Sequence, residues 1–145
     1  MKARILWIGK TKEKYLAEGI NKYLRMLEPF IHVEIVEIKE EKDKRAARAM
    51  TEEAARILKK SSSYFLLDEQ GRQMSSTEFA GFIRDRQHMD FVLGGPYGVA
   101  QEIKDRAAGL ISVSRMTLTH EMARLVFAEQ LYRAFTIIKG KGYHH

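Results

Sequence analysis

The sequence contains no cysteine among its 145 residues. This absence excludes disulfide bonds, thiolate catalysis, iron–sulfur clusters and cysteine-based zinc sites, and it favours a reducing compartment. Proline is scarce, at two residues, and no stretch rich in serine, glycine or proline could serve as a linker. No apolar run approaches membrane-spanning length, and the start MKARILWIGK reaches glycine and lysine too early for a signal peptide. The sequence therefore predicts one domain over residues 1–145 in a soluble, cytoplasmic protein.

The chain does contain enough apolar sequence for a core, and it has an excess of positive charge. Hydrophobic residues make up 45% of it and charged residues 30%, which indicates a globular rather than a disordered protein. Lysine and arginine number 25 against 19 acidic residues, which gives a net charge of +6. Because neutralising phosphates releases counterions, this excess favours a polyanionic partner, although many basic proteins are merely soluble.

Segments typical of strands and of helices alternate along the chain. Short runs rich in β-formers predict strands at residues 3–9, 32–38, 64–67, 91–93 and 110–114. Apolar residues at helical spacing predict helices at about 15–27, 75–87, 100–108 and 121–138. The charged stretch 40–48 is typical of a solvated loop and leads into a further helix that ends at about residue 60. Thr51 could instead begin the second helix, and Ser75 and Glu78 have the spacing of a capping box. This alternation predicts an α/β fold with a mainly parallel sheet and helices on both faces.

An open parallel sheet binds ligands beyond the carboxyl ends of its strands. This rule selects three connections: the turn after Leu67, the loop after Leu93 and the loop after Ser114. In the second, the sequence GGPYG of residues 94–98 would let the backbone approach a ligand, although a tight strand-to-helix turn needs the same residues. The glycine spacing matches neither the dinucleotide-binding fingerprint nor the P-loop.

The third connection, residues 113–120, brings backbone N–H and C=O groups and hydroxyls to the start of the last helix. Such groups suit the edge of a flat heterocycle. Alternatively, Thr119 is an ordinary helix N-cap, and Met116 and Leu118 are ordinary core residues. His120 at a helix start more often caps the helix than acts as a base. The histidines form no helical metal-binding pair, so no metal site is expected.

Basic and aromatic residues are interleaved along the last helix and the tail. They are Arg124, Tyr132, Arg133, Phe135, Lys139, Lys141 and Tyr143. This pattern suits RNA, in which phosphates meet Lys or Arg and unstacked bases stack on rings. The alternative is a solvated helix face above an aromatic core stripe. We favour the core for Phe127 and Phe135, and a functional or intersubunit role for Tyr143.

The longer motifs resemble those of a known family. ARILWIGK, FLLDEQG, FVLGGPYG, SVSRMTLTHEMARLVFAEQLYRAF and the final GYHH are similar, in this order from end to end, to the small SPOUT-class methyltransferases that methylate N3 of a pseudouridine in large-subunit ribosomal RNA. The resemblance implies S-adenosyl-L-methionine as cofactor, a carboxyl-terminal trefoil knot, a homodimer and assembled ribosomes as substrate. Alternatives are another RNA target such as transfer RNA, or a noncatalytic RNA- or ribosome-binding module.

By motif position, the resemblance implies a cofactor cradle of nine residues. They are Leu67, Gly94, Gly95, Val113, Ser114, Arg115, Met116, Thr117 and Leu118. It also implies that Arg133, Tyr143 and His144 lie by the target base, with His120 and Arg124 near the dimer interface and the pocket. The methyl group on the sulfonium of S-adenosyl-L-methionine is already activated, so we expect the transfer to need no metal. The N3 imide must lose its proton; we assign His144 as base and Arg133 as the group that stabilises negative charge, unless solvent takes the proton.

Two positions depart from the family pattern. Thr119 stands where the family usually has proline, which could loosen the loop before the last helix. A basic residue usually follows the Tyr-His pair, whereas this chain has His145, which would weaken a phosphate contact.

The last helix also supports the homodimer. It carries apolar residues beyond those that one small sheet face needs, namely Leu125, Val126, Leu131 and Phe135.

Overall fold

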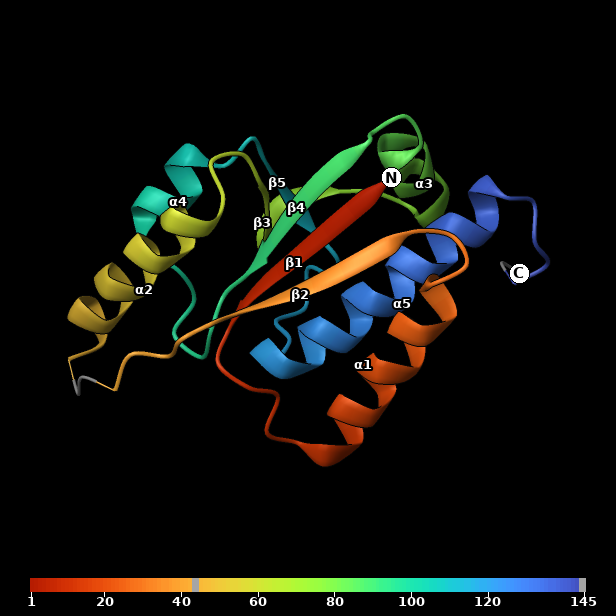
Figure 1. Cartoon of the computed structure of the whole chain (residues 1–145). Coiled ribbons are helices and arrows are strands. Elements are labelled where there is room, and N and C mark those ends of the chain that lie inside the picture. Colours follow the sequence, from red (N-terminus) through yellow and green to blue (C-terminus); the bar gives the residue numbers. More distant parts are fainter. Residues whose placement is uncertain (43–44, 144–145) are drawn as a thin grey trace.

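The computed structural model describes residues 1–42 and 45–143 (Figure 1). The strands are β1 (Lys2–Ile8), β2 (His32–Ile38), β3 (Phe65–Gln73), β4 (His88–Leu93) and β5 (Gly109–Ser112). The helices are α1 (Lys14–Leu27), α2 (Ala46–Lys60), α3 (Ser76–Ile83), α4 (Gln101–Arg106) and α5 (His120–Ile138). Strands and helices alternate, so the predicted order of elements is confirmed.

The five strands form one sheet in the order β2-β1-β4-β3-β5, and every pair of neighbours is parallel. The predicted α/β class with a parallel sheet is confirmed. Because all strands run in the same direction, their carboxyl ends meet at one edge. Side chains from connections far apart in the sequence can converge there.

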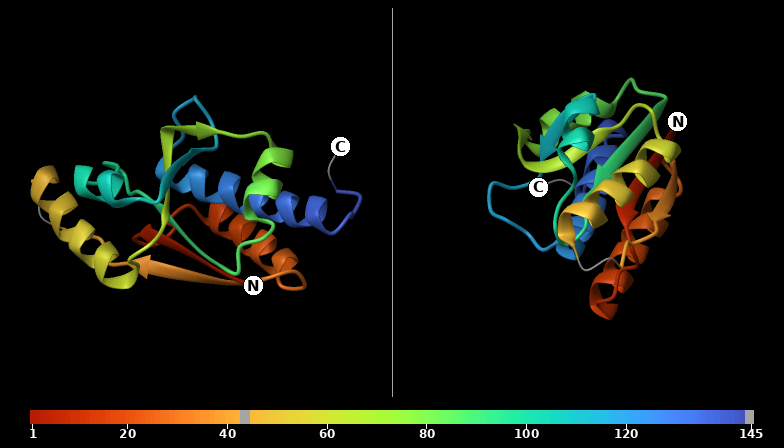
Figure 2. Two further views of the ribbon diagram at one scale, coloured as in Figure 1. Left: turned by 90° about the horizontal axis from the view of Figure 1, so that it is seen from above. Right: turned by 90° about the vertical axis from the view of Figure 1, so that its left-hand side faces the viewer.

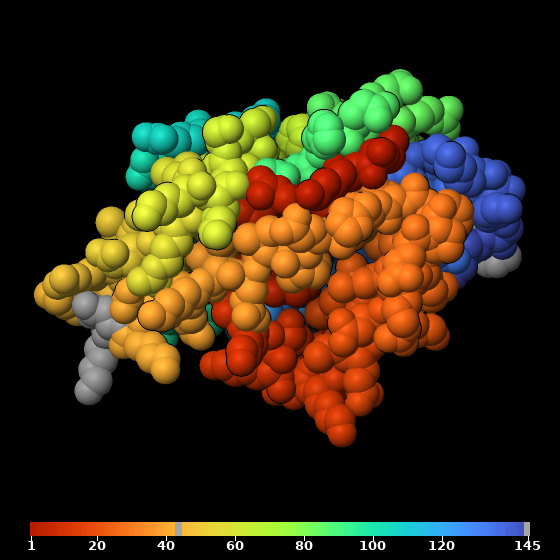
Figure 3. Space-filling model, in the orientation of Figure 1, coloured from red at the N-terminus to blue at the C-terminus, as the bar shows by residue number. Residues whose placement is uncertain are grey.

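Helices cover both faces of the sheet, and each face has its own hydrophobic core (Figure 2). On one face, α1, α3 and α5 bury a cluster that includes Phe79, Phe91 and Phe127. On the other, α2 and α4 bury a smaller cluster that includes Ile57 and Ile103. The edge strand β2 and helix α1 form much of the face seen in Figure 3. The prediction that Phe127 and Phe135 are core residues is confirmed, since both are 1% exposed.

The structure confirms one predicted helix start and rejects another. Ser75 accepts a hydrogen bond from the Glu78 N–H while the Glu78 side chain accepts from the Ser75 N–H, so the predicted capping box is confirmed. Thr51 lies inside α2, and its hydroxyl donates to the Ala47 carbonyl over 3.0 Å. The alternative in which Thr51 begins that helix is therefore wrong.

The predicted polar turn after Leu67 is wrong. Strand β3 continues to Gln73, with a register shift between Leu67 and Arg72, after which it pairs with β5 again. A Cβ at Gly71 would lie 2.6 Å from the backbone of Ile111, so only glycine lets β3 return this closely to β5. Residues 68–70 therefore bulge from the end of the sheet instead of leading into a helix. Strand β5 is also shorter than predicted and ends at Ser112.

In the part of the chain that the structure describes, no helix combines the length and apolar character needed to span a membrane.

Candidate functional site

A cleft of about 680 Å³ lies at the carboxyl edge of the sheet. Residues 67–70 of β3, the connections after β4 and β5, and the first turn of α5 line it. Its volume falls within the range of pockets that bind small molecules, about 300–1,000 Å³. The three strand ends selected from the sequence therefore converge on one cleft.

Eight of the nine predicted cradle residues line this cleft. They are Leu67, Gly94, Gly95, Val113, Ser114, Met116, Thr117 and Leu118. Arg115 is exposed and is not among the lining residues. The bulge of β3 adds Asp68, Glu69 and Gln70, which sequence reasoning missed although the polar run DEQG directly after Leu67 was a signal for them.

The glycines of the β4 connection are needed to fold it. A Cβ on Gly94 would lie 3.0 Å from the Gly98 carbonyl carbon, and a Cβ on Gly95 would lie 3.2 Å from the Ile8 Cβ. The turn closes through a hydrogen bond from the Gly98 N–H to the Gly95 carbonyl (3.0 Å), and Gly98 has a φ of +80°. The connection is therefore a tight turn, and this turn forms one wall of the cleft.

The β5 connection is held in shape by its own hydroxyl groups. The Met116 N–H donates to Ser114 Oγ (2.9 Å), and the Thr117 hydroxyl donates to Glu69 Oε2 (2.6 Å), which joins this loop to the β3 bulge. The Thr119 side chain accepts from the Met122 N–H, so the predicted N-cap is confirmed. Met116 is 79% exposed, so the alternative that made it a core residue is wrong.

Charged and titratable groups also lie at the cleft. Asp68 Oδ2 and Lys104 Nζ, both from lining residues, are 3.3 Å apart. His120 lines the cleft from the first turn of α5. Burial and then the Arg124 charge lower its pKa, which favours a neutral imidazole at pH 7. Among the described residues, no group of three or more His, Asp or Glu side chains is placed to hold a metal ion.

Arg124 belongs to the interior of the subunit. It is fully buried and donates hydrogen bonds to the carbonyls of Ile8 and Gly9 and to the Thr11 hydroxyl. Its guanidinium lies over the Trp7 ring, 4.8 Å from the centroid. The sequence interpretation that grouped Arg124 with basic residues available to RNA is therefore wrong, because this side chain joins α5 to the end of β1.

Arg133 and Tyr143 lie together at the other end of α5. The Arg133 guanidinium is 2.8 Å from Glu129 and 4.8 Å from the centre of the Tyr143 ring, which also packs edge-on against Tyr132. A hydrogen bond with Tyr23, together with burial, raises the pKa of Tyr143 to about 12, so its phenol is protonated at neutral pH. Tyr143, for which the sequence favoured a functional or intersubunit role, therefore also packs within its own subunit.

One chain does not bring the two groups of predicted site residues together. Arg133 follows His120 by thirteen positions on α5, which corresponds to about 20 Å along the helix. The cleft therefore lies at the first turn of α5, whereas the Arg133–Tyr143 pair lies toward the other end of that helix. The third predicted catalytic residue, His144, lies outside the described residues.

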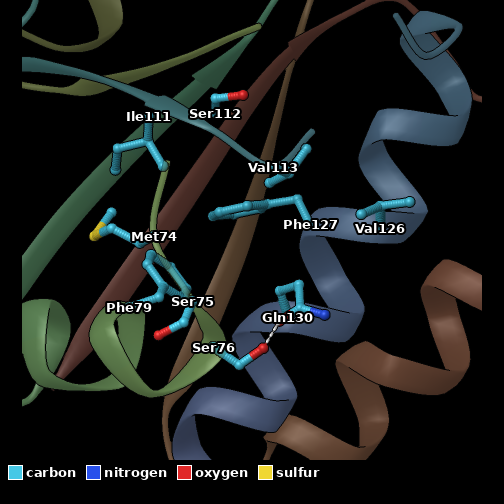
Figure 4. A pocket seen from close by; sticks show the side chains of 10 residues that line it. All are labelled: Met74, Ser75, Ser76, Phe79, Ile111, Ser112, Val113, Val126, Phe127 and Gln130. Carbon is cyan, nitrogen blue, oxygen red and sulfur yellow. Dashed lines mark hydrogen bonds between the residues drawn. The ribbon is translucent and has the colours of Figure 1, made fainter. Parts of the chain in front are cut away.

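A second cavity of about 250 Å³ lies between α3, β5 and α5 (Figure 4). Most of its walls are apolar side chains such as Phe79 and Phe127, and it shares Val113 with the larger cleft. The Ser76 hydroxyl donates to Gln130 Oε1 over 2.7 Å, so these two polar groups satisfy each other. We therefore assign ligand-binding chemistry to the larger cleft.

Comparisons with known proteins agree with this geometry. A family model described as "Predicted SPOUT methyltransferase" matches residues 1–144. Proteins named Ribosomal RNA large subunit methyltransferase H are 44% identical to this chain in Thermodesulfovibrio yellowstonii (98% of this chain, 97% of the relative) and in Geotalea uraniireducens (100% of both). The structure of "a probable methylase family protein" from Haemophilus influenzae Rd KW20 superposes with a TM-score of 0.55 at 12% identity. The match covers 95% of this chain and 66% of that one, which supports the fold alone. The chain therefore belongs to the SPOUT methyltransferase family.

Proposed function

We propose that this protein transfers a methyl group from S-adenosyl-L-methionine to N3 of a pseudouridine in large-subunit ribosomal RNA. Residues 1–145 act as one domain on assembled ribosomes in the cytoplasm. The observation that carries the proposal is the cleft, which gathers eight residues of the motifs by which the chain resembles the pseudouridine-N3 methyltransferases. The relatives named Ribosomal RNA large subunit methyltransferase H match over their full length, which favours the same class of substrate.

The lining of the cleft fits this cofactor. Turns 94–98 and 113–118 present peptide groups that suit a heterocycle edge. Asp68 and Glu69 add carboxylates that suit the cationic half of the molecule. The cofactor supplies an activated methyl group, so the transfer depends on alignment and exclusion of water and needs no Lewis acid.

The remaining chemistry is removal of the N3 proton. Tyr143 is unsuited to this task because its pKa of about 12 keeps the phenol protonated, so we assign it as a hydrogen-bond donor to the base. We propose His144 as the general base and Arg133 as the cation that stabilises charge on the deprotonated imide or a phosphate.

We further propose that the complete site forms in a homodimer, in which the tail of one subunit reaches the cleft of its partner. The separation of about 20 Å along α5 motivates this arrangement. No residue of α5 is highly exposed, and Val126 and Met122 are half-buried apolar residues on it. Leu131 and Phe135 do not contribute, because they belong to the subunit's own core. The trefoil knot implied by the family resemblance is part of the same proposal.

The dimer predicts a concentration-independent mass near twice that of the chain. Sedimentation equilibrium at micromolar concentration measures this mass directly. A stable monomer that retains full activity under the same conditions would contradict both the dimer and the shared site.

The proposed reaction is tested by tritium transfer from labelled S-adenosyl-L-methionine to assembled ribosomes, isolated subunits and bulk transfer RNA. We expect label in large-subunit RNA of ribosomes, at a position that maps to a pseudouridine. Label in transfer RNA alone would favour the alternative of a methyltransferase that acts on transfer RNA. Calorimetry that detects no cofactor binding would favour a noncatalytic RNA-binding module.

A further inference from the structure

The connection from β1 to α1 carries a concentration of positive charge that the proposed reaction has not used. We define the basic loop as residues 10–15, with the sequence KTKEKY, which comprises part of this connection and the first two residues of α1. Its three lysines, Lys10, Lys12 and Lys14, are all exposed, against one glutamate. The Tyr15 side chain at the end of this segment is 63% exposed, so its ring is open to contact with a partner.

Little of this charge is neutralised within the subunit. Among the residues that the structure describes, neither Lys10 nor Lys14 forms an ion pair. Lys12 Nζ lies 3.9 Å from Glu40, but its side chain is 74% exposed, so the pair is weak and open to exchange. The loop therefore presents cations to an external partner.

The loop is nevertheless held in place by buried groups. Arg124 donates to the Ile8 and Gly9 carbonyls at its start and to the Thr11 hydroxyl within it. At its other side, the Glu121 carboxylate accepts from the Glu13 N–H over 2.9 Å. A loop held at both ends loses little conformational entropy when it binds a partner.

The same contacts place the loop at the rim of the cleft. Arg124 and Glu121 belong to the first turns of α5, next to the cleft-lining residue His120. Strand β1 is also hydrogen-bonded to β4, and Gly95 of the cleft wall packs on Ile8 at the end of β1. Figure 1 shows the β1–α1 connection (red) extending beyond the sheet before α1 begins.

We propose that the basic loop binds the phosphate backbone of the substrate RNA, with Tyr15 stacking on an unpaired base, and so positions the RNA over the cleft. This inference rests on the proposed function for the identity of the RNA. Lysines separated by one residue suit successive phosphates as point charges, and an exposed tyrosine suits a splayed base.

The test uses a triple variant, Lys10→Gln, Lys12→Gln and Lys14→Gln. The matched control is Lys59→Gln, Lys60→Gln and Arg84→Gln, which removes three exposed cations at the opposite edge, before β3 and β4. Binding to deproteinised large-subunit RNA is measured over a range of salt concentrations, and KM is measured with assembled ribosomes.

We expect the loop variant to lower the slope of log affinity against log salt by about 2, as three lost phosphate contacts on single-stranded RNA predict. KM for ribosomes should rise by roughly tenfold or more, while cofactor affinity stays within twofold and the control behaves as wild type. Tyr15→Ala should weaken RNA binding roughly 5- to 150-fold, and Tyr15→Phe should retain it.

Several results would overturn the inference. An unchanged salt slope would show that the lysines contact no phosphate. A raised KM for ribosomes with normal affinity for deproteinised RNA would assign the loop to a ribosomal protein, and a large loss of cofactor affinity would assign it to support of the cleft. If wild type transfers no methyl group, the proposed function fails, whereas the salt slope still decides the role of the loop.

Discussion

Removal of residues 142–145 should reduce methyl transfer to ribosomes by about 10²–10⁴-fold, the range typical of a lost general base, while cofactor affinity stays within a few-fold. The deletion takes away His144 and Tyr143, but it leaves every residue of the cleft in place. Because the Tyr143 ring packs on Tyr132 and Arg133, we also expect the melting temperature to fall by roughly 3–6 °C. Single-turnover kinetics, calorimetry and thermal melting separate the three quantities.

Two point variants locate the effect within the tail. His144→Ala should account for most of the kinetic loss without changing the melting temperature, and Tyr143→Phe should keep the ring packing while removing the hydroxyl. If the imide loses its proton unaided, the His144→Ala loss will be smaller and will fall mainly on RNA binding. A truncated enzyme that methylates ribosomes at the full-length rate would remove the tail from the mechanism.

The substitution Gly94→Val should weaken cofactor binding by roughly 100-fold, close to the upper end of what overpacking strain of about 1–3 kcal/mol produces. Its Cβ would lie 3.0 Å from the Gly98 carbonyl carbon and 3.1 Å from Val99 Cγ1, so the neighbouring atoms of the turn must shift. That turn is a wall of the cleft, and its displacement changes the surface that the cofactor meets. Isothermal titration calorimetry measures the affinity, and circular dichroism checks the fold.

The matched control is Gly81→Ala. Gly81 lies on α3, and a Cβ added there would meet no atom within 4 Å, so its substitution should leave both affinity and fold unchanged. Normal cofactor affinity in Gly94→Val would mean that the cradle has been placed in the wrong part of the sheet edge.

The tail deletion and Gly94→Val together test whether the site is shared between subunits. At a cofactor concentration too low to occupy the Gly94→Val cleft, each variant alone should be nearly inactive. A mixed dimer pairs one intact cleft with the intact tail of the other chain. Random exchange of subunits should restore about a quarter of wild-type activity, because half of the dimers are mixed and each has one complete site. No recovery after verified exchange would mean that each tail acts on its own cleft.

The parts of this site that were predictable from sequence are those that depend on local pattern. Leu67 lies within, and Gly94 and Gly95 directly follow, strands whose β-forming runs are evident. The parallel arrangement brings the carboxyl ends of these strands to one edge. The caps at Ser75 and Thr119 also depend only on residues within one turn. Local chemistry was therefore sufficient for the alternation of elements and for the position of the cleft.

The parts that were missed depend on contacts between distant segments. The extension of β3 requires the fit of Gly71 against the backbone of Ile111, which no nearby residue signals. Arg124 has the spacing of a surface cation, and only the folded chain brings the carbonyls of Ile8 and Gly9 to it. Tyr143 similarly appeared unpacked because its partner rings, Tyr23 and Tyr132, come from two different helices.

The buried contact of Arg124 also has a consequence for biosynthesis. Its hydrogen bonds to Ile8 and Gly9 join residues 116 and 115 positions apart, so the first strand to leave the ribosome depends on the last helix to be made. Contacts of such long sequence separation make folding slow, since the loop entropy is lost before the contact forms. Until α5 emerges, the Trp7 ring and the end of β1 lack their cover. An enzyme proposed to modify finished ribosomes thus completes its own fold only after one of them has translated α5.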